Sequence, residues 1–168
     1  LIFEQLAMGC TTTTAMLTIH NMATWMVSDY ANAATKAKYG EQLTSGELLA
    51  SYCLTEPNAG SDAASLTTKG EKDGDVYVMT GSKVFISGAG ETDILVVMAR
   101  TGEPGPKGVS AFVVDANAEG ISYGRKEDKM GWNAQPTRMV NFDQVRVPAS
   151  NLLGNEGDGF TIAMKGLD

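Results

Sequence analysis

Histidine and cysteine are scarce in this sequence of 168 residues: His20 is the only histidine, and Cys10 and Cys53 are the only cysteines. A single histidine cannot build a multi-histidine metal centre and suggests no Ser-His-Asp relay, so we predict no metal site. We expect His20 to be a hydrogen-bonded histidine on a helix. The two cysteines have neither metal-site nor redox-motif spacing, which favours a reducing compartment.

Positive charge and long apolar runs are also limited. Thirteen basic and twenty acidic residues give a net charge of −7, which excludes the basic surface that nucleic acids and anionic membranes attract. No apolar run approaches the roughly 20 residues that a membrane-spanning helix needs. The start lacks the basic and apolar pattern of an export signal. We therefore expect no nucleic-acid partner and no membrane span.

The first part of the chain has the apolar spacing of helices. A first helix is predicted to end at Gly9, and the hydroxyls of residues 11–14 are candidate N-caps for a second. Apolar residues then recur every three or four positions, which predicts one helix face: Met16, Ile19, Met22, Ala23, Met26, Val27 and Tyr30. Asn32 is a candidate N-cap for a third helix, with Gly40 as its end.

From Leu49 the apolar period changes to two, which is typical of strands. The Asp73-Gly74 pair predicts a hairpin turn between two of them. The uninterrupted apolar run 94–98 is typical of a strand buried on both faces. The predicted strands are 66–72, 76–80, 84–87, 93–100, 109–115, 121–124, 137–142 and 145–147. Their number and hairpin-like spacing favour an antiparallel sandwich or barrel.

These patterns predict an α+β protein in three parts. Residues 1–51 would end an N-terminal helical domain, residues 52–154 would form a middle β-barrel domain, and residues 155–168 would start a C-terminal helical domain from about Phe160. The chain begins at Leu1, already inside a helical pattern, and stops inside another. We therefore expect it to be an internal segment of a longer protein.

The segment 52–61 is the first candidate binding site. Its order is Tyr52, Cys53, Leu54, Thr55, Glu56, Pro57, Asn58, Ala59, Gly60 and Ser61. A strand should stop near Glu56 because Pro57 cannot donate to a sheet, and Gly60 can take a positive φ in the turn. The strand end would present hydroxyls, backbone N–H groups and two carboxylates to a flat polar ligand. An ordinary exit from a strand into a loop is the alternative.

The second candidate segment is Phe85-Ile86-Ser87. Phe85 could stack on a flavin ring, and Ser87 and Thr55 could donate hydrogen bonds to the ring's carbonyls and N5. The alternatives are core packing for Phe85 and a strand-end cap for Ser87. Gly154, Gly157 and Gly159 precede a helix but follow no parallel strand, so they do not predict a dinucleotide site.

The stretch 53–65 closely resembles the signature of the acyl-CoA dehydrogenases, a long pattern constrained at many positions. Many members of that family have tryptophan at the position of Phe85, threonine at Ser87 and glycine at Asn58, so this chain keeps the aromatic and hydroxyl functions with a smaller ring. Residues 130–138, with Gly131-Trp132-Asn133 followed by Gln135-Pro136-Thr137-Arg138, resemble most the isobutyryl-CoA dehydrogenase branch.

The resemblance implies FAD as cofactor, held by residues 52–61 and 85–87, with Ser61 also contacting the acyl-CoA substrate. The implied reaction is α,β-dehydrogenation of a short branched acyl-CoA, as in valine catabolism: a glutamate takes the α-proton while the β-hydride passes to the flavin. In the family the glutamate comes from a later helical domain, so this chain would supply no catalytic residue and would be inactive alone.

The resemblance also implies an electron-transferring flavoprotein as electron acceptor and a homotetramer for the full-length protein. A bacterial cytoplasm is favoured over the mitochondrial matrix, where relatives also work. Two alternatives stay open: an acyl-CoA oxidase of the same fold, whose flavin is reoxidised by dioxygen, and a non-catalytic β-barrel binding module.

Overall fold

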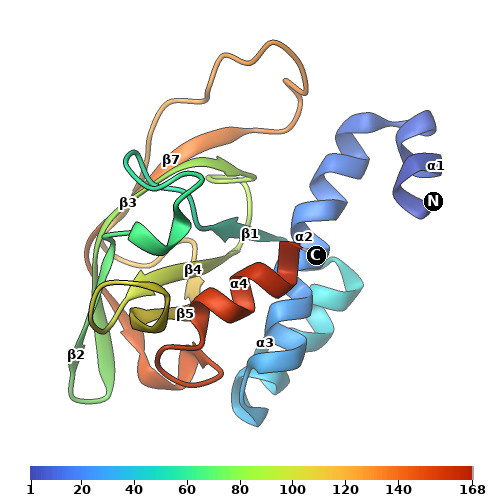
Figure 1. The fold of residues 1–168 in the computed structure, drawn as a ribbon. Coiled ribbons are helices and arrows are strands. Elements are labelled where there is room, and N and C mark those ends of the chain that lie inside the picture. Colours follow the sequence, from blue (N-terminus) through green and yellow to red (C-terminus); the bar gives the residue numbers. More distant parts are fainter. Residues whose placement is uncertain (168) are drawn as a thin grey trace.

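The computed structural model describes residues 1–167 and confirms a mixed α+β architecture (Figure 1). The helices are α1 (Ile2–Gly9), α2 (Thr11–Tyr30), α3 (Ala33–Ser45) and α4 (Gly159–Leu167). The strands are β1 (Ala50–Cys53), β2 (Lys69–Asp73), β3 (Val76–Ser87), β4 (Ile94–Arg100), β5 (Val109–Asp115), β6 (Ile121–Tyr123), β7 (Thr137–Pro148) and β8 (Leu152–Leu153). The predicted C-terminal part, 155–168, is described as far as residue 167.

The helix ends differ from the prediction at two places. The N-cap of α2 is Cys10, whose thiol accepts a hydrogen bond from the backbone N–H of Thr13, so the threonines lie inside the helix. Asn32 does cap α3, but Gly40 does not end it. The helix continues to Ser45 and is capped by Gly46, which has a φ of 77°. Tyr39 and Leu43 are both buried, and their packing outweighs the weak helix propensity of Gly40.

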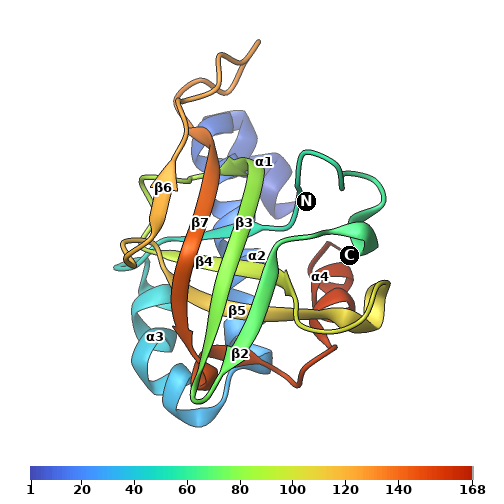
Figure 2. The same cartoon turned by 90° about the vertical axis from the view of Figure 1, so that its left-hand side faces the viewer.

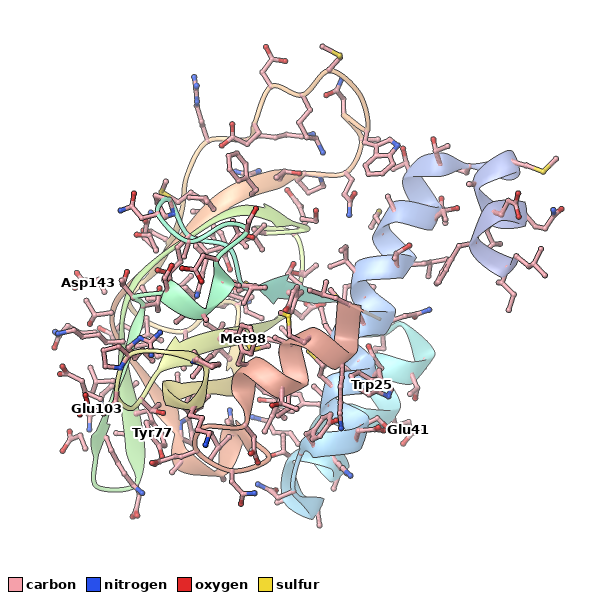
Figure 3. The ribbon with its side chains drawn as sticks, in the orientation of Figure 1. Trp25, Glu41, Tyr77, Met98, Glu103 and Asp143 are labelled. Atoms are coloured by element: carbon pink, nitrogen blue, oxygen red, sulfur yellow. The ribbon has the colours of Figure 1, made fainter. Side chains whose placement is uncertain are left out.

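The strands form one folded sheet with the order β6-β7-β3-β2-β4-β5-β8. Figure 2 shows β7, β3 and β2 side by side, with β4 and β5 crossing behind them. One apolar core lies between these two halves, and a second lies between β4, β5 and the helices. Tyr77 of the first core and Met98 of the second are labelled in Figure 3.

Strand β4 is buried on both faces, as its apolar run predicted. Ile94, Val96 and Met98 pack toward the helices, whereas Leu95 and Val97 belong to the core inside the folded sheet. The hairpin at Asp73-Gly74 is also confirmed, since β2 and β3 pair antiparallel and Gly74 has a φ of 60°. Helices α2 and α4 therefore cover the outer face of the same strand whose inner face builds the barrel-like core.

Most strand pairings are antiparallel, including that of β4 with β5, but β1 joins the other edge of β4 in parallel from Ala50↔Ile94 to Cys53↔Val97. A single parallel pair, Lys69↔Arg100, also links β2 to β4. Parallel pairing requires a long crossover connection, and here residues 54–93 provide it. The hairpin-like spacing of the predicted strands could not indicate this parallel pairing.

Two predicted strand breaks are bends inside continuous strands. Segments 76–80 and 84–87 form the single strand β3, and 137–142 and 145–147 form β7. The pairing of β3 with β7 shifts register between Met79 and Gly81 and again between Lys83 and Ile86. Such bulges bend a strand without ending it. Strand β2 begins at Lys69, not Leu66, because the N–H groups of Thr67 and Thr68 donate to the Glu56 carboxylate.

Helix α4 lies so close to β5 that Gly159 leaves no room for a side chain. A Cβ at Gly159 would meet backbone atoms of Ser110 at 2.4 Å and of Ala111 at 2.7 Å. We expect Gly159→Ala to lower the free energy of unfolding by about 1–3 kcal/mol, because the helix must shift away from the strand. Thermal unfolding would measure the loss.

Gly40→Ala is the matched control, because Gly40 is also helical but has open space around its Cα. It should raise stability by about 0.5–1 kcal/mol through helix propensity. If Gly159→Ala and Gly40→Ala changed the free energy of unfolding equally, the close packing of α4 on β5 would be contradicted.

Candidate functional site

The two candidate segments meet at one cavity of about 280 Å³. From the predicted residues, the cavity is lined by Tyr52, Leu54, Thr55, Phe85, Ile86 and Ser87. Strand β1 carries the first segment to the cavity and the end of β3 carries the second. Thr55 and Ser87 lie 32 positions apart in the sequence, but both line the same cavity as Phe85.

The remaining predicted residues lie elsewhere. The side chain of Cys53 is buried in the core inside the sheet, and Ala59 is also buried. Pro57, Asn58, Gly60 and Ser61 are exposed on the loop that follows the cavity. These loop residues can reach a ligand only where it extends beyond the cavity.

The loop turns one step earlier than predicted. Glu56 and Ala59 exchange two backbone hydrogen bonds of 3.1 Å, so Pro57 and Asn58 form the centre of a tight turn. The φ of Gly60 is not in the positive region, and a Cβ there would meet nothing within 4 Å. The prediction that a positive φ at Gly60 makes this turn was wrong, because Pro57 presets the required φ at the first central position.

Phe85 is held in an unusual conformation. Its φ is 59° and its side chain is 67% exposed, although its neighbours Val84 and Ile86 are buried. In the pairing with β7, Lys83 lies opposite Val140 and Ile86 opposite Arg138, so Phe85 occupies a bulge. A left-handed conformation costs a non-glycine residue about 1–2 kcal/mol. The strained backbone at Phe85 therefore turns its aromatic ring out of the core, so that the ring lines the cavity.

The end of β3 is fixed from the other side. The Ser87 carbonyl accepts a hydrogen bond of 2.7 Å from the Ser51 hydroxyl, which also bonds the Thr92 hydroxyl at 2.7 Å. The next residue, Gly88, donates from its N–H to the Pro136 carbonyl at 2.8 Å. A rigid backbone therefore holds the Ser87 hydroxyl at the cavity wall.

Tyr52 contributes an unsatisfied donor. Tyr52 lines the cavity, but its hydroxyl is buried and has no hydrogen-bond partner among residues 1–167. Burial raises the pKa of Tyr52, with a smaller contribution from Cys53, so the phenol stays neutral. A buried polar group without a partner is costly.

Glu56 and Lys83 form a buried ion pair behind the cavity. Lys83 Nζ lies 2.7 Å from Glu56 Oε1, and the side chains are 0% and 4% exposed. The carboxylate also accepts from the N–H groups of Thr67 at 2.7 Å and Thr68 at 2.9 Å. The Glu56 carboxylate is consequently not presented to a ligand, contrary to the prediction of two carboxylates at this wall.

Acid should weaken the fold through Glu56. Burial by itself raises the pKa of Glu56, but the Lys83 ammonium and the hydrogen bonds from Thr67 and Thr68 outweigh it and lower the pKa to about 2 from an ordinary value of 4.5. A lowered pKa gives stability that is present above about pH 4.5 and is lost as the pH falls toward 2. The loss amounts to about 2–3 kcal/mol.

Unfolding curves of the wild type and of Glu56→Gln between pH 7 and about pH 2 test this expectation, because the amide does not titrate. Glu56→Gln should be less stable at neutral pH and should lose less stability on acidification. Parallel pH profiles for the two proteins would contradict it.

Sequence reasoning missed four residues of this region. Ile19 and Met22 of α2 and Leu167 of α4 also line the cavity. The helical spacing of Ile19 and Met22 marked them as apolar, but nothing showed which surface they cover. Lys83 was missed because lysines are almost never fully buried unless they are paired, and its partner lies 27 positions away.

His20 is hydrogen-bonded on α2, as predicted. Its Nδ1 accepts from the Ala50 N–H at 3.1 Å, so the ring proton is on Nε2, which donates to the Leu43 carbonyl at 2.9 Å. His20 thereby fixes α2 to the start of β1. Within residues 1–167 there is no group of three potential metal-ligating side chains, and none of the helices described there is long and apolar enough to cross a bilayer.

Comparison with known proteins shows consistent similarity. The sequence matches the family described as acyl-CoA dehydrogenase, middle domain, over residues 51–145. Isobutyryl-CoA dehydrogenase, mitochondrial, from Bos taurus is 52% identical over 168 residues, which are 100% of this chain and 40% of the relative. The chain therefore spans about two fifths of the length of this relative.

Solved structures agree. A glutaryl-coenzyme A dehydrogenase in complex with glutaryl-CoA has a TM-score of 0.94 at 35% identity, over 99% of this chain and 42% of that chain. An FAD complex of PigA has a TM-score of 0.89 at 28% identity, over 94% of this chain and 42% of that chain. The family match includes both segments that line the cavity, 52–55 and 85–87. This chain belongs to the acyl-CoA dehydrogenase family.

Proposed function

We propose that the protein containing this chain is an FAD-dependent dehydrogenase of a short branched acyl-CoA similar to isobutyryl-CoA. This chain would supply the part that contacts the flavin and the thioester, through residues 52–61 and 85–87. The observation that carries the proposal is the shared cavity of Thr55, Phe85 and Ser87, into which a strained backbone turns an aromatic ring. The division into 1–51, 52–154 and 155–168 is part of the same proposal.

The cavity walls fit a flavin. The exposed face of Phe85 offers a stacking surface for a flat ring. Thr55 and Ser87 offer hydroxyls that could hydrogen-bond a polar rim. A flavin held by these residues would supply the acceptor for the hydride from the β-carbon of the substrate. Residues on the wall would hold the ring in place and stabilise the charge that reduction leaves at its polar edge.

Ser61 is proposed to contact the acyl-CoA. It is exposed on the loop that begins where the cavity wall ends, so it can reach a substrate that lies against the open side of a bound ring. Ser61 is not among the residues that line the cavity, which fits a role toward the substrate better than one toward the inner edge of the ring.

The base is proposed to come from outside residues 1–167. No acidic residue lines the cavity in the part of the chain that the structure describes, and the nearby Glu56 is buried and paired with Lys83. A group that takes the α-proton must reach it within hydrogen-bond distance. We therefore propose that the isolated chain is inactive, and that the intact protein is a homotetramer that passes electrons to an electron-transferring flavoprotein. The acidic composition supports a bacterial cytoplasm over a mitochondrial matrix.

The test uses the intact protein that carries this chain. We expect it to purify yellow, with one FAD per subunit, and its visible flavin band should bleach when isobutyryl-CoA is added without oxygen. Rapid return of the colour in air would identify an acyl-CoA oxidase instead. A colourless protein that takes up no FAD would contradict the proposal and support a binding module.

A further inference from the structure

Lys83 joins the two walls of the cavity. Its Nζ donates to the Leu54 carbonyl at 3.1 Å and to Glu56 Oε1 at 2.7 Å, so it bonds both residues that flank Thr55. The next residue, Val84, donates its N–H to the Thr55 carbonyl at 2.9 Å. Phe85 follows directly, and its backbone conformation therefore depends on the same anchor points as Thr55.

Glu56 extends this connection to a third segment. Its Oε2 accepts from both the N–H and the hydroxyl of Thr67, at 2.7 and 2.9 Å, and its Oε1 accepts from the N–H of Thr68. These residues lie just before β2. The pair thus fastens the turn after Thr55 to the sheet, and the charged groups are shielded from water.

We infer that Lys83 and Glu56 are positioning residues for the flavin. They would fix the separation between the hydroxyl wall at Thr55 and the aromatic wall at Phe85, without touching the ring themselves. The inference rests on the proposed function, since it assumes that the cavity holds FAD. It assigns the buried pair a role beyond stability, because well-packed apolar residues often replace a buried ion pair with no loss of stability.

The physical reason is geometric. An apolar pair could fill the same volume, but it would offer no donor to the Leu54 carbonyl and no acceptor to Thr67 and Thr68. Thr55 would then lose the anchors on both neighbouring residues and keep its own backbone bond to Val84. Binding groups lose much of their effect when they shift by about 1 Å. If the cavity walls are mobile by this amount, the ligand must order them when it binds, and the entropy lost in that ordering weakens binding.

The experiment compares four variants of the intact protein: Lys83→Met, the double variant Lys83→Met/Glu56→Leu, Thr67→Val, and the control Arg146→Met. Arg146 pairs with Asp73 at 3.0 Å on the surface and away from the cavity. For each variant, thermal unfolding of the flavin-free protein and the FAD dissociation constant are measured. The shape of the visible flavin band is recorded as a third readout, because it reports the surroundings of the ring.

We expect Lys83→Met to lose both stability and FAD affinity. The double variant should regain part of the thermal stability that Lys83→Met loses, because it leaves no unpaired buried charge, although Thr67 and Thr68 still lack their acceptor. Its FAD dissociation constant should stay at least about 10-fold above the wild type, with an altered flavin band. Thr67→Val, which removes one bond to Glu56 and keeps the side-chain volume, should weaken FAD binding about 2–3-fold with little change in unfolding temperature. Arg146→Met should match the wild type in all three readouts.

A double variant that recovers both stability and FAD affinity would overturn the inference, and so would Thr67→Val and Lys83→Met proteins that bind FAD like the wild type. If the double variant does not fold, the FAD affinity of Thr67→Val alone tests the inference. A wild type that takes up no FAD would instead overturn the proposed function, and the inference with it.

Discussion

Replacing Glu56 with alanine is expected to lower the free energy of unfolding by about 3–5 kcal/mol at neutral pH. The change leaves the Lys83 ammonium, which is 0% exposed, without its carboxylate at 2.7 Å. It also leaves the N–H groups of Thr67 and Thr68 without their acceptor. Each kcal/mol corresponds to about 2–4 °C in unfolding temperature for a chain of this size, so thermal denaturation would detect the loss readily.

Glu71→Ala is the control for this prediction. Glu71 also pairs with a lysine, Lys69, but at 3.7 Å and with both side chains largely exposed. An exposed pair contributes about 0–1 kcal/mol, so Glu71→Ala should hardly change the unfolding temperature. If the two alanine variants unfolded alike, the account of Glu56 as a buried anchor would be wrong.

Replacing Phe85 with glycine is expected to separate stability from cofactor affinity. Glycine adopts a positive φ without strain, so the flavin-free protein should gain about 1 kcal/mol. The stacking surface is lost at the same time. Burial of a phenylalanine side chain is worth about 1.5–3 kcal/mol, so FAD should bind about 10–100-fold more weakly. Thermal unfolding and flavin titration of the intact protein measure the two effects.

Trp132 is a matched control for Phe85. It is another aromatic residue with positive φ, 53°, and it is 62% exposed, but it does not line the cavity. Trp132→Gly should give a similar gain in stability and leave FAD affinity unchanged. A loss of affinity in Trp132→Gly, or none in Phe85→Gly, would place the flavin contact elsewhere.

Local patterns predicted the parts of the fold that depend on neighbouring residues. The apolar run of β4 indicated burial on both faces because alternate side chains enter two different cores. The Asp73-Gly74 turn was predictable because only a few residue types accept its backbone angles. The signature at 53–65 also predicted the family, since many positions are constrained together. Such signals lie within a few residues along the chain.

Features that depend on distant residues were not predictable. The parallel pairing of β1 with β4 joins residues 44 positions apart, such as Ala50 and Ile94. The burial of Lys83 depends on Glu56, and lysine by itself indicates a solvent-exposed position. The bulge at Phe85 depends on its register with β7, so the sequence predicted a ring near the cavity but not the strained backbone that turns it outward.

A structure of the intact protein with bound FAD would test the central claim most directly. We predict that the flavin ring stacks on Phe85, with its polar edge within hydrogen-bond distance of Thr55 and Ser87. A flavin bound elsewhere, with these three side chains making no contact to it, would contradict the account.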